Sequence, residues 1–182
     1  MLRFLLLAAA PVVVLAATDA RAQSASPQTS QFIAKAAATD AFEVDAGNLA
    51  QKKSANADVK AFAAMMVKAH TDTTAKLLAV LDKDHLPKPS KMPNPDPNQA
   101  KQLTDLVNAP KGQFDRAYIH SQVVAHQQAQ ALMEQYAASG DNPDIKTLAA
   151  ATQPAVQQHL DMAQKLEAQL GGPPKSLGRK ED

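Results

Sequence analysis

Prolines cluster in one stretch near the middle of the chain and are scarce in the long segments on either side. Five fall between residues 84 and 98: Pro87, Pro89, Pro93, Pro95 and Pro97. Because proline has no amide hydrogen and a fixed φ, this density excludes a helix and favours an extended path. The chain is therefore expected to fold as two halves joined by a long crossover.

The first half contains two long helical segments. One runs from Gln31 to Lys53, with apolar and small residues at helical spacing. The next begins after Asn56, whose side chain makes a good N-cap, and ends near Asp82. Its predicted inward face consists of Val59, Phe62, Met66, His70, Thr74, Leu77 and Leu81.

The second half repeats this plan. A short helical segment is predicted over Gln99–Asn108, and a third long helix covers about 110–139. The fourth long helix is capped by Asn142 and runs to Leu170. Four long helices then make two hairpins with short turns, joined by the Pro-rich crossover. Loop lengths of this kind predict an all-α fold, a ferritin-like four-helix bundle.

The N-terminus has the pattern of a secretory signal peptide. An apolar run from Phe4 to Ala17 follows a positive start and precedes the small-residue cleavage site Ala20-Arg21-Ala22. The run has about 14 residues, whereas a membrane-spanning helix needs roughly 20. We therefore expect residues 1–22 to be removed, no transmembrane helix to remain, and the protein to be exported to the periplasm or cell envelope.

The remaining residues suit one domain. We expect a flexible leader at 23–30, the four-helix bundle domain at 31–170 and a disordered tail at 171–182. The tail begins where Gly171-Gly172-Pro173-Pro174 stops the last helix.

Charge and composition exclude several functions. The chain carries 19 basic and 18 acidic side chains without a Lys/Arg-rich stripe, which argues against nucleic acid as a partner. It has no Cys, so disulfides, thiolate metal ligands and thiol redox chemistry are excluded.

Four polar residues fall near the midpoints of the four long helices: Glu43, His70, His126 and His159. Counted from the expected helix starts, their heights agree within roughly one turn at about 1.5 Å per residue. A buried imidazole or carboxylate is costly unless it has a partner. Residues that share a buried layer should therefore bind one another or a metal ion.

Three imidazoles and one carboxylate suit Cu, Zn, Fe or Mn, with or without an open coordination position. A ferritin-type di-iron centre is disfavoured, because its Glu-x-x-His pairs would need acids where Val67 and Val123 stand. Asp40, one turn before Glu43, is either a support for the cluster or a surface charge. His85 and His120 are expected to lie outside the cluster.

Methionines near the cluster would favour copper if they were ligands, although Met at helical spacing more often packs in a core. They are Met65, Met66, Met133 and Met162.

Several segments resemble a known family in their order. They are Phe32 to Ala36 with Glu43-Val44, Val59 to Ala63 with Met66-Val67 and His70, Phe114 to Ile119 with His126, and Pro154 with His159-Leu160. Over about residues 30–170 the chain is similar to the exported bacterial family called domain of unknown function 4142. The resemblance implies a ferritin-like bundle in the cell envelope, without an established activity, in which the four cluster residues carry over. That family commonly has Asp directly before the histidines of helices two and three, where this chain has Ala69 and Ala125, so the resemblance does not extend to a carboxylate-rich metal centre.

Two functions follow from these patterns. The first is an exported bundle that binds a transition metal at the cluster, for envelope metal handling or stress tolerance. The second is a non-catalytic envelope structural or interaction protein, whose histidines stabilise the core or respond to pH by protonating at about pH 6 to 7. A hydrolytic triad is not indicated. A third class, an oxidase or catalase-like metalloenzyme, would need an open coordination position and a substrate path, neither of which is visible in the sequence, so an enzyme is the less favoured class. Another envelope protein or a second copy of the chain is a candidate partner.

Overall fold

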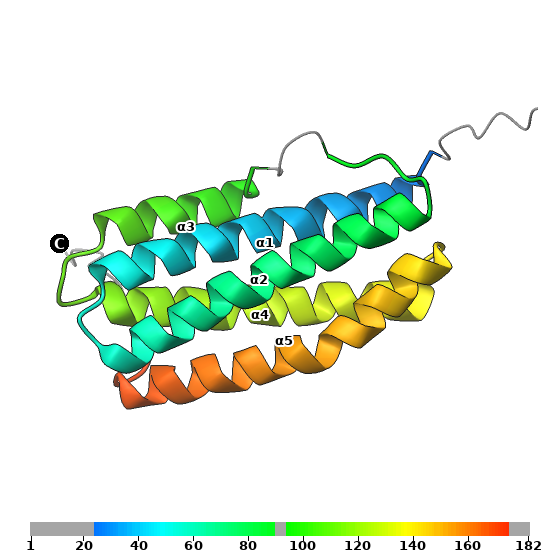
Figure 1. Ribbon diagram of the computed structural model, residues 1–182. Coiled ribbons are helices and arrows are strands. Elements are labelled where there is room, and N and C mark those ends of the chain that lie inside the picture. Colours follow the sequence, from blue (N-terminus) through cyan, green and yellow to red (C-terminus); the bar gives the residue numbers. More distant parts are fainter. Residues whose placement is uncertain (1–23, 90–93, 175–182) are drawn as a thin grey trace, which may run out of the picture.

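The computed structural model describes residues 24–89 and 94–174, which form five α-helices and no strand (Figure 1). The predicted all-α fold is confirmed. The predicted signal peptide, residues 1–22, lies outside the described residues, and so does most of the predicted tail. Within the described part, no helix combines the length and the apolar character that crossing a membrane requires.

The first hairpin consists of α1 (Pro27–Lys53) and α2 (Ala57–Lys83). α1 begins at Pro27 rather than at Gln31, because the Ser26 side chain accepts a hydrogen bond from the amide of Thr29 and caps the helix. The second half of the expected leader is therefore helical. Asn56 caps α2 as predicted, accepting hydrogen bonds from the first turn.

The crossover leads into a short helix, α3 (Pro97–Asn108), which lies beside α1 and α4. It starts two residues before the predicted Gln99, because Asp96 and Gln99 form a capping box and proline is tolerated at the first helical position. At its other end, the Lys53 ammonium donates to the carbonyls of Leu106 and Val107, which ties α3 to the end of α1.

The second hairpin consists of α4 (Phe114–Ser139) and α5 (Pro143–Gln169). Asn142 caps α5 and Pro143 occupies its first turn, as predicted. Pro154 lies inside α5 and removes one backbone hydrogen bond. After α5, the Arg116 guanidinium donates to the carbonyls of residues 171–173, so the start of the predicted tail is tied to α4.

Contacts between the hairpins fix the direction of each helix. Phe32 near the start of α1 stacks on Tyr136 near the end of α4, with ring centroids 4.2 Å apart. Lys83 at the end of α2 pairs with Asp144 at the start of α5. Both neighbouring pairs across the hairpins are therefore antiparallel. In chain order the four long helices α1, α2, α4 and α5 therefore run up, down, down and up. Four-helix bundles with a single long crossover have this arrangement.

α1 packs tightly against α2 at Gly47. A Cβ added there would lie 2.7 Å from a methyl group of Val67 and 3.0 Å from the carbonyl oxygen of Ala63. Only glycine allows this spacing, which brings the polar residues of α1 against α2.

The core consists of two apolar clusters, one toward each end of the bundle. The first contains Phe42, Met66, Val123 and Leu160, and the second contains Leu77, Ala129 and Val156, each with further residues. Along α2, α4 and α5, the residues of one cluster are followed by the residues of the other, and the change occurs near the middle of each helix. A polar layer lies between the two clusters at this height.

Candidate metal centre

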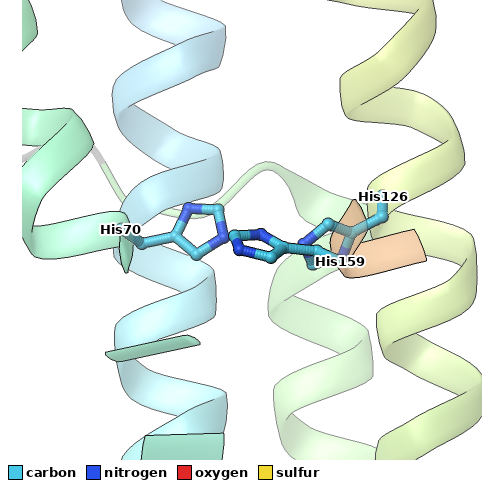
Figure 2. A group of neighbouring side chains, drawn as sticks. All are labelled: His70, His126 and His159. Carbon is cyan, nitrogen blue, oxygen red and sulfur yellow. The ribbon is translucent and has the colours of Figure 1, made fainter. Parts of the chain in front are cut away.

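Three histidines from three helices point toward one another between the two apolar clusters (Figure 2). His70 comes from α2, His126 from α4 and His159 from α5. One nitrogen of each ring lies within 4.8 Å of those of the other two. Their ring centroids are 5.4 to 6.0 Å apart. The structure therefore brings the three predicted histidines into one group.

His70 is held by a carboxylate of α1. Its Nδ1 lies 2.8 Å from Oδ1 of Asp40, and the Thr74 hydroxyl donates to Oδ2 of the same carboxylate at 3.0 Å. Asp40 is only 4% exposed. Since a carboxylate accepts, the His70 Nδ1 carries the proton, and its buried Nε2, which has no hydrogen-bond partner, is left free. Asp40 is thus a support for the cluster rather than a surface charge.

The same carboxylates affect the charge of His70. Burial lowers the pKa of His70, but the hydrogen bond to Asp40 and the negative charges of Glu43 and Asp40 outweigh it and raise the pKa above 6.5. His70 is therefore the member of the cluster that takes a proton most readily.

His126 is held by its own helix. Its Nδ1 donates to the backbone carbonyl of Gln122 at 2.9 Å, and its Nε2 is buried without a partner. Burial, together with the positive charges of His70 and His159, lowers the pKa of His126 to about 3, although the bond to Gln122 acts in the opposite direction. His126 is a neutral ring with one free nitrogen.

His159 completes the group from α5 and is half-buried. Burial and the charge of His70 lower the pKa of His159 to about 4. The expectation that the histidines protonate at about pH 6 to 7 is therefore wrong for His126 and His159. Their burial in the apolar bundle disfavours the charged form.

Glu43 of α1 lies in the same layer but on another side of His126. Its Oε1 is 3.8 Å from His126 Nδ1, the nitrogen that already donates to Gln122, and both of its oxygens are buried without a hydrogen-bond partner. Burial raises the pKa of Glu43 to about 7, against the lowering effects of the His70 charge and the Gln122 side chain. The structure thus places Glu43 beside the three histidines, with its carboxyl group at the edge of the His126 ring.

The other histidines lie elsewhere, as expected. His120 pairs with Glu167 at 2.7 Å on the outside of α4, and His85 is exposed after the end of α2. The four methionines expected near the cluster pack in the apolar core or against it, Met66 and Met133 being almost fully buried.

The arrangement has the features of a metal site in which outer groups orient the ligands. A metal-binding histidine usually donates its second ring N–H to a carboxylate or a backbone carbonyl, which fixes its tautomer and aims the other nitrogen. Asp40 does this for His70, and Gln122 does it for His126. Nothing in the sequence pattern indicated the Gln122 contact, because a backbone carbonyl has no residue-type signal.

Comparisons with known proteins give a family and a fold. The model of a family described as a domain of unknown function (DUF4142) matches residues 14–166. A crystal structure of a DUF305 fragment from Deinococcus radiodurans is similar, with a TM-score of 0.66 and 18% sequence identity, covering 82% of this chain and 99% of that chain. At this identity the likeness shows the fold alone. No curated protein matches the chain.

Proposed function

Since the chain belongs to the family described as a domain of unknown function, DUF4142, we propose its function from the geometry of the site: the protein binds one transition-metal ion through His70, His126 and His159. The observation that carries the proposal is the pair of buried Nε2 atoms without partners on His70 and His126, beside a third histidine. A buried polar atom without a partner costs about 1–3 kcal/mol, and a metal ion would satisfy both at once.

The donor set indicates the class of metal. Imidazole nitrogen suits Zn, Cu and Fe, and three such ligands leave a fourth position open for water or another donor. Glu43 stays a predicted contributor, because the structure places its Oε1 3.8 Å from Nδ1 of His126.

We propose binding rather than turnover as the function, in the periplasm or cell envelope, for metal handling or stress tolerance. The location is supported by the signal-peptide pattern of residues 1–22. Metal binding is supported over a pH-responsive role by the lowered pKa values of about 3 and 4 at His126 and His159, which keep both rings neutral at neutral pH.

The test is metal content, measured by mass spectrometry on residues 23–182 prepared without a His-tag and challenged with Cu, Zn, Mn and Fe. We expect about one metal ion per chain in the wild type and almost none in a His70→Ala/His126→Ala variant that is still helical by circular dichroism. His85→Ala/His120→Ala is the matched control, since it also removes two histidines but leaves the cluster intact, and it should keep its metal. A wild type without metal would leave the cluster as a structural feature and refute the proposal.

A further inference from the structure

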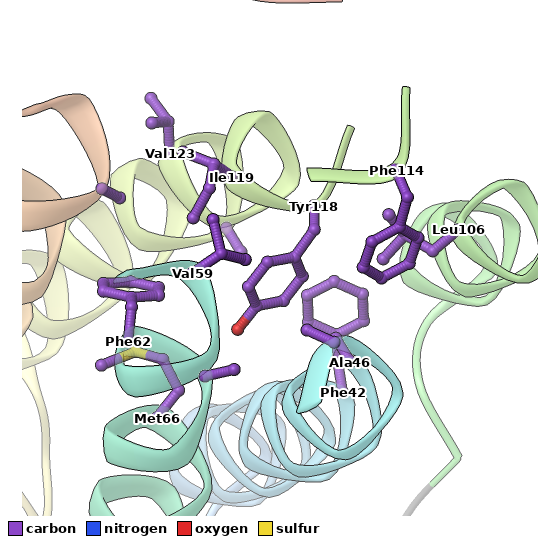
Figure 3. Packing of buried hydrophobic residues seen from close by; sticks show 14 of the residues in the cluster. Phe42, Ala46, Val59, Phe62, Met66, Leu106, Phe114, Tyr118, Ile119 and Val123 are labelled. Atoms are coloured by element: carbon purple, nitrogen blue, oxygen red, sulfur yellow. The ribbon is translucent and has the colours of Figure 1, made fainter. Parts of the chain in front are cut away.

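A row of buried polar groups without partners extends from the histidines into the apolar core. It consists of the Glu43 carboxyl, the Gln122 side-chain amide and the Tyr118 hydroxyl, all on side chains that are 0% exposed. Tyr118, Gln122 and His126 are spaced four residues apart on α4 and so lie on one stripe of the helix. Figure 3 shows the Tyr118 ring reaching from α4 into the apolar cluster that includes Phe42 and Met66.

This row contrasts with the way the rest of the core is built. Thr29 and Asp40, two other buried polar side chains, have hydrogen-bond partners. Each unpartnered group in a native core requires an explanation, such as a bound ion or water. Here the row ends at the edge of the His126 ring, where the Glu43 carboxyl meets it.

The row and Asp40 place two carboxyl groups of α1 beside the three histidines. Asp40 contacts His70, and Glu43 lies beside His126. Among the described residues, the buried polar side chains include no Lys or Arg. The bound cation itself must therefore balance the carboxylates in the metal-bound state. A buried charge without a partner is strongly disfavoured, so two carboxylates suit a cation of charge two better than a cation of charge one.

We propose that Glu43 makes the site selective for divalent ions over monovalent copper, and that Gln122 is a positioning residue for its carboxylate. This inference rests on the proposed function, since it requires metal at the three histidines. Glu43 acts through its charge beside His126 and needs no bond to the metal. Gln122 lies one helical turn before His126, so its side-chain amide is a donor on α4 that can turn toward the carboxyl group beside the His126 ring.

The experiment measures the affinity for Zn²⁺ and for Cu⁺ by competition with chelators, in the wild type and in Glu43→Gln. The substitution keeps the shape of the side chain and removes its charge. We expect the Zn²⁺ affinity to fall about tenfold and the Cu⁺ affinity about threefold, because the Coulomb energy lost with one negative charge is twice as large for a dication as for a monocation. Gln122→Leu, which removes the side-chain amide but keeps the backbone carbonyl that holds His126, should lower the Zn²⁺ preference in the same direction by a smaller factor.

Asp45→Asn is the matched control, because it removes the same charge from an exposed position on the same helix. It should leave both affinities unchanged. If Glu43→Gln does not fold, Glu43→Met provides the same comparison with an apolar side chain of similar length.

The possible results separate the two proposals. A wild type that binds neither ion refutes the proposed function, and this inference with it. A wild type that binds both, with a Zn²⁺/Cu⁺ ratio that Glu43→Gln leaves unchanged, overturns the inference alone. Equal loss of both affinities also overturns it, because Glu43 would then only maintain the structure of the site.

Discussion

The two hairpins start alike but contribute different chemistry to the layer between them. Asn56 and Asn142 cap corresponding helices, and an acidic residue follows each in the first turn. Yet α1–α2 supplies one histidine and two buried carboxyl groups, whereas α4–α5 supplies two histidines. The acidic groups of the layer are therefore on one hairpin, and most of the free nitrogens are on the other.

This asymmetry is visible in the pKa values. On α1–α2, burial raises the pKa of Glu43 to about 7, and the carboxylates raise the pKa of His70. On α4–α5, burial lowers the pKa of His126 to about 3 and that of His159 to about 4. A metal ion would join the hairpins, since its three nitrogen ligands come from both.

The largest expected effect is stabilisation of the whole bundle by metal. At a free metal concentration of about 1,000 times Kd, the folded state gains about 4 kcal/mol. Because the ligands span both hairpins, His70→Ala and His126→Ala should each remove most of this gain. Thermal unfolding with and without metal measures it. Stabilisation that persists in His70→Ala would show that α4–α5 binds the metal alone, and stabilisation that persists in His126→Ala would show that His126 is not a ligand.

The next effect tests the close contact within the first hairpin. Gly47→Val would press a branched side chain against Val67 and the Ala63 carbonyl, and overpacking of this kind costs roughly 2 to 3 kcal/mol. Urea unfolding measures the loss. Gly112→Val is the control, because a Cβ at Gly112 has no atom within 4 Å. Equal effects at both positions would show that the contact with α2 is not what requires glycine.

The sequence predicted the helices and the histidine group, because both depend on periodicity, caps and loop lengths. Asn56 and Asn142 cap the helices they were expected to cap, and the expected level of His70, His126 and His159 is the level at which they meet. The start of α1 was missed, because a cap by Ser26 depends on backbone geometry rather than on periodicity. The sequence also could not predict on which side of the His126 ring Glu43 lies. Packing contacts, such as that at Gly47, set the rotation of each helix within the bundle.

A third prediction uses pH to separate the hairpins in metal-free protein. Glu43 has a folded pKa raised to about 7 from 4.5, so its contribution to stability increases as pH falls from 7 toward 4.5. The raised pKa of His70 acts in the same direction. His126 and His159 have lowered folded pKa values, so stability is lost as pH falls below 6.5 toward about 3 and 4. The two hairpins therefore oppose each other during acidification.

Glu43→Gln removes the contribution of Glu43 from this balance. Between pH 7 and pH 5, the variant should lose stability relative to the wild type by on the order of 2 kcal/mol, because the Glu43 contribution is missing. Urea unfolding at several pH values with a chelator present measures the difference. Parallel curves for the two proteins would mean that Glu43 does not gain a proton in this range.

The smallest predicted effect concerns the carboxylate that orients His70. Asp40→Asn keeps an oxygen that can accept from Nδ1 but removes the charge, so we expect about a tenfold loss of metal affinity, near 1.4 kcal/mol. Asp45→Asn is the control, because Asp45 lines the same surface hollow as Asp40 without contacting a histidine. Metal titration of both variants measures the difference. An Asp40 variant with unchanged affinity would mean that α1 contributes only packing to His70, and that the chemical difference between the hairpins rests on Glu43.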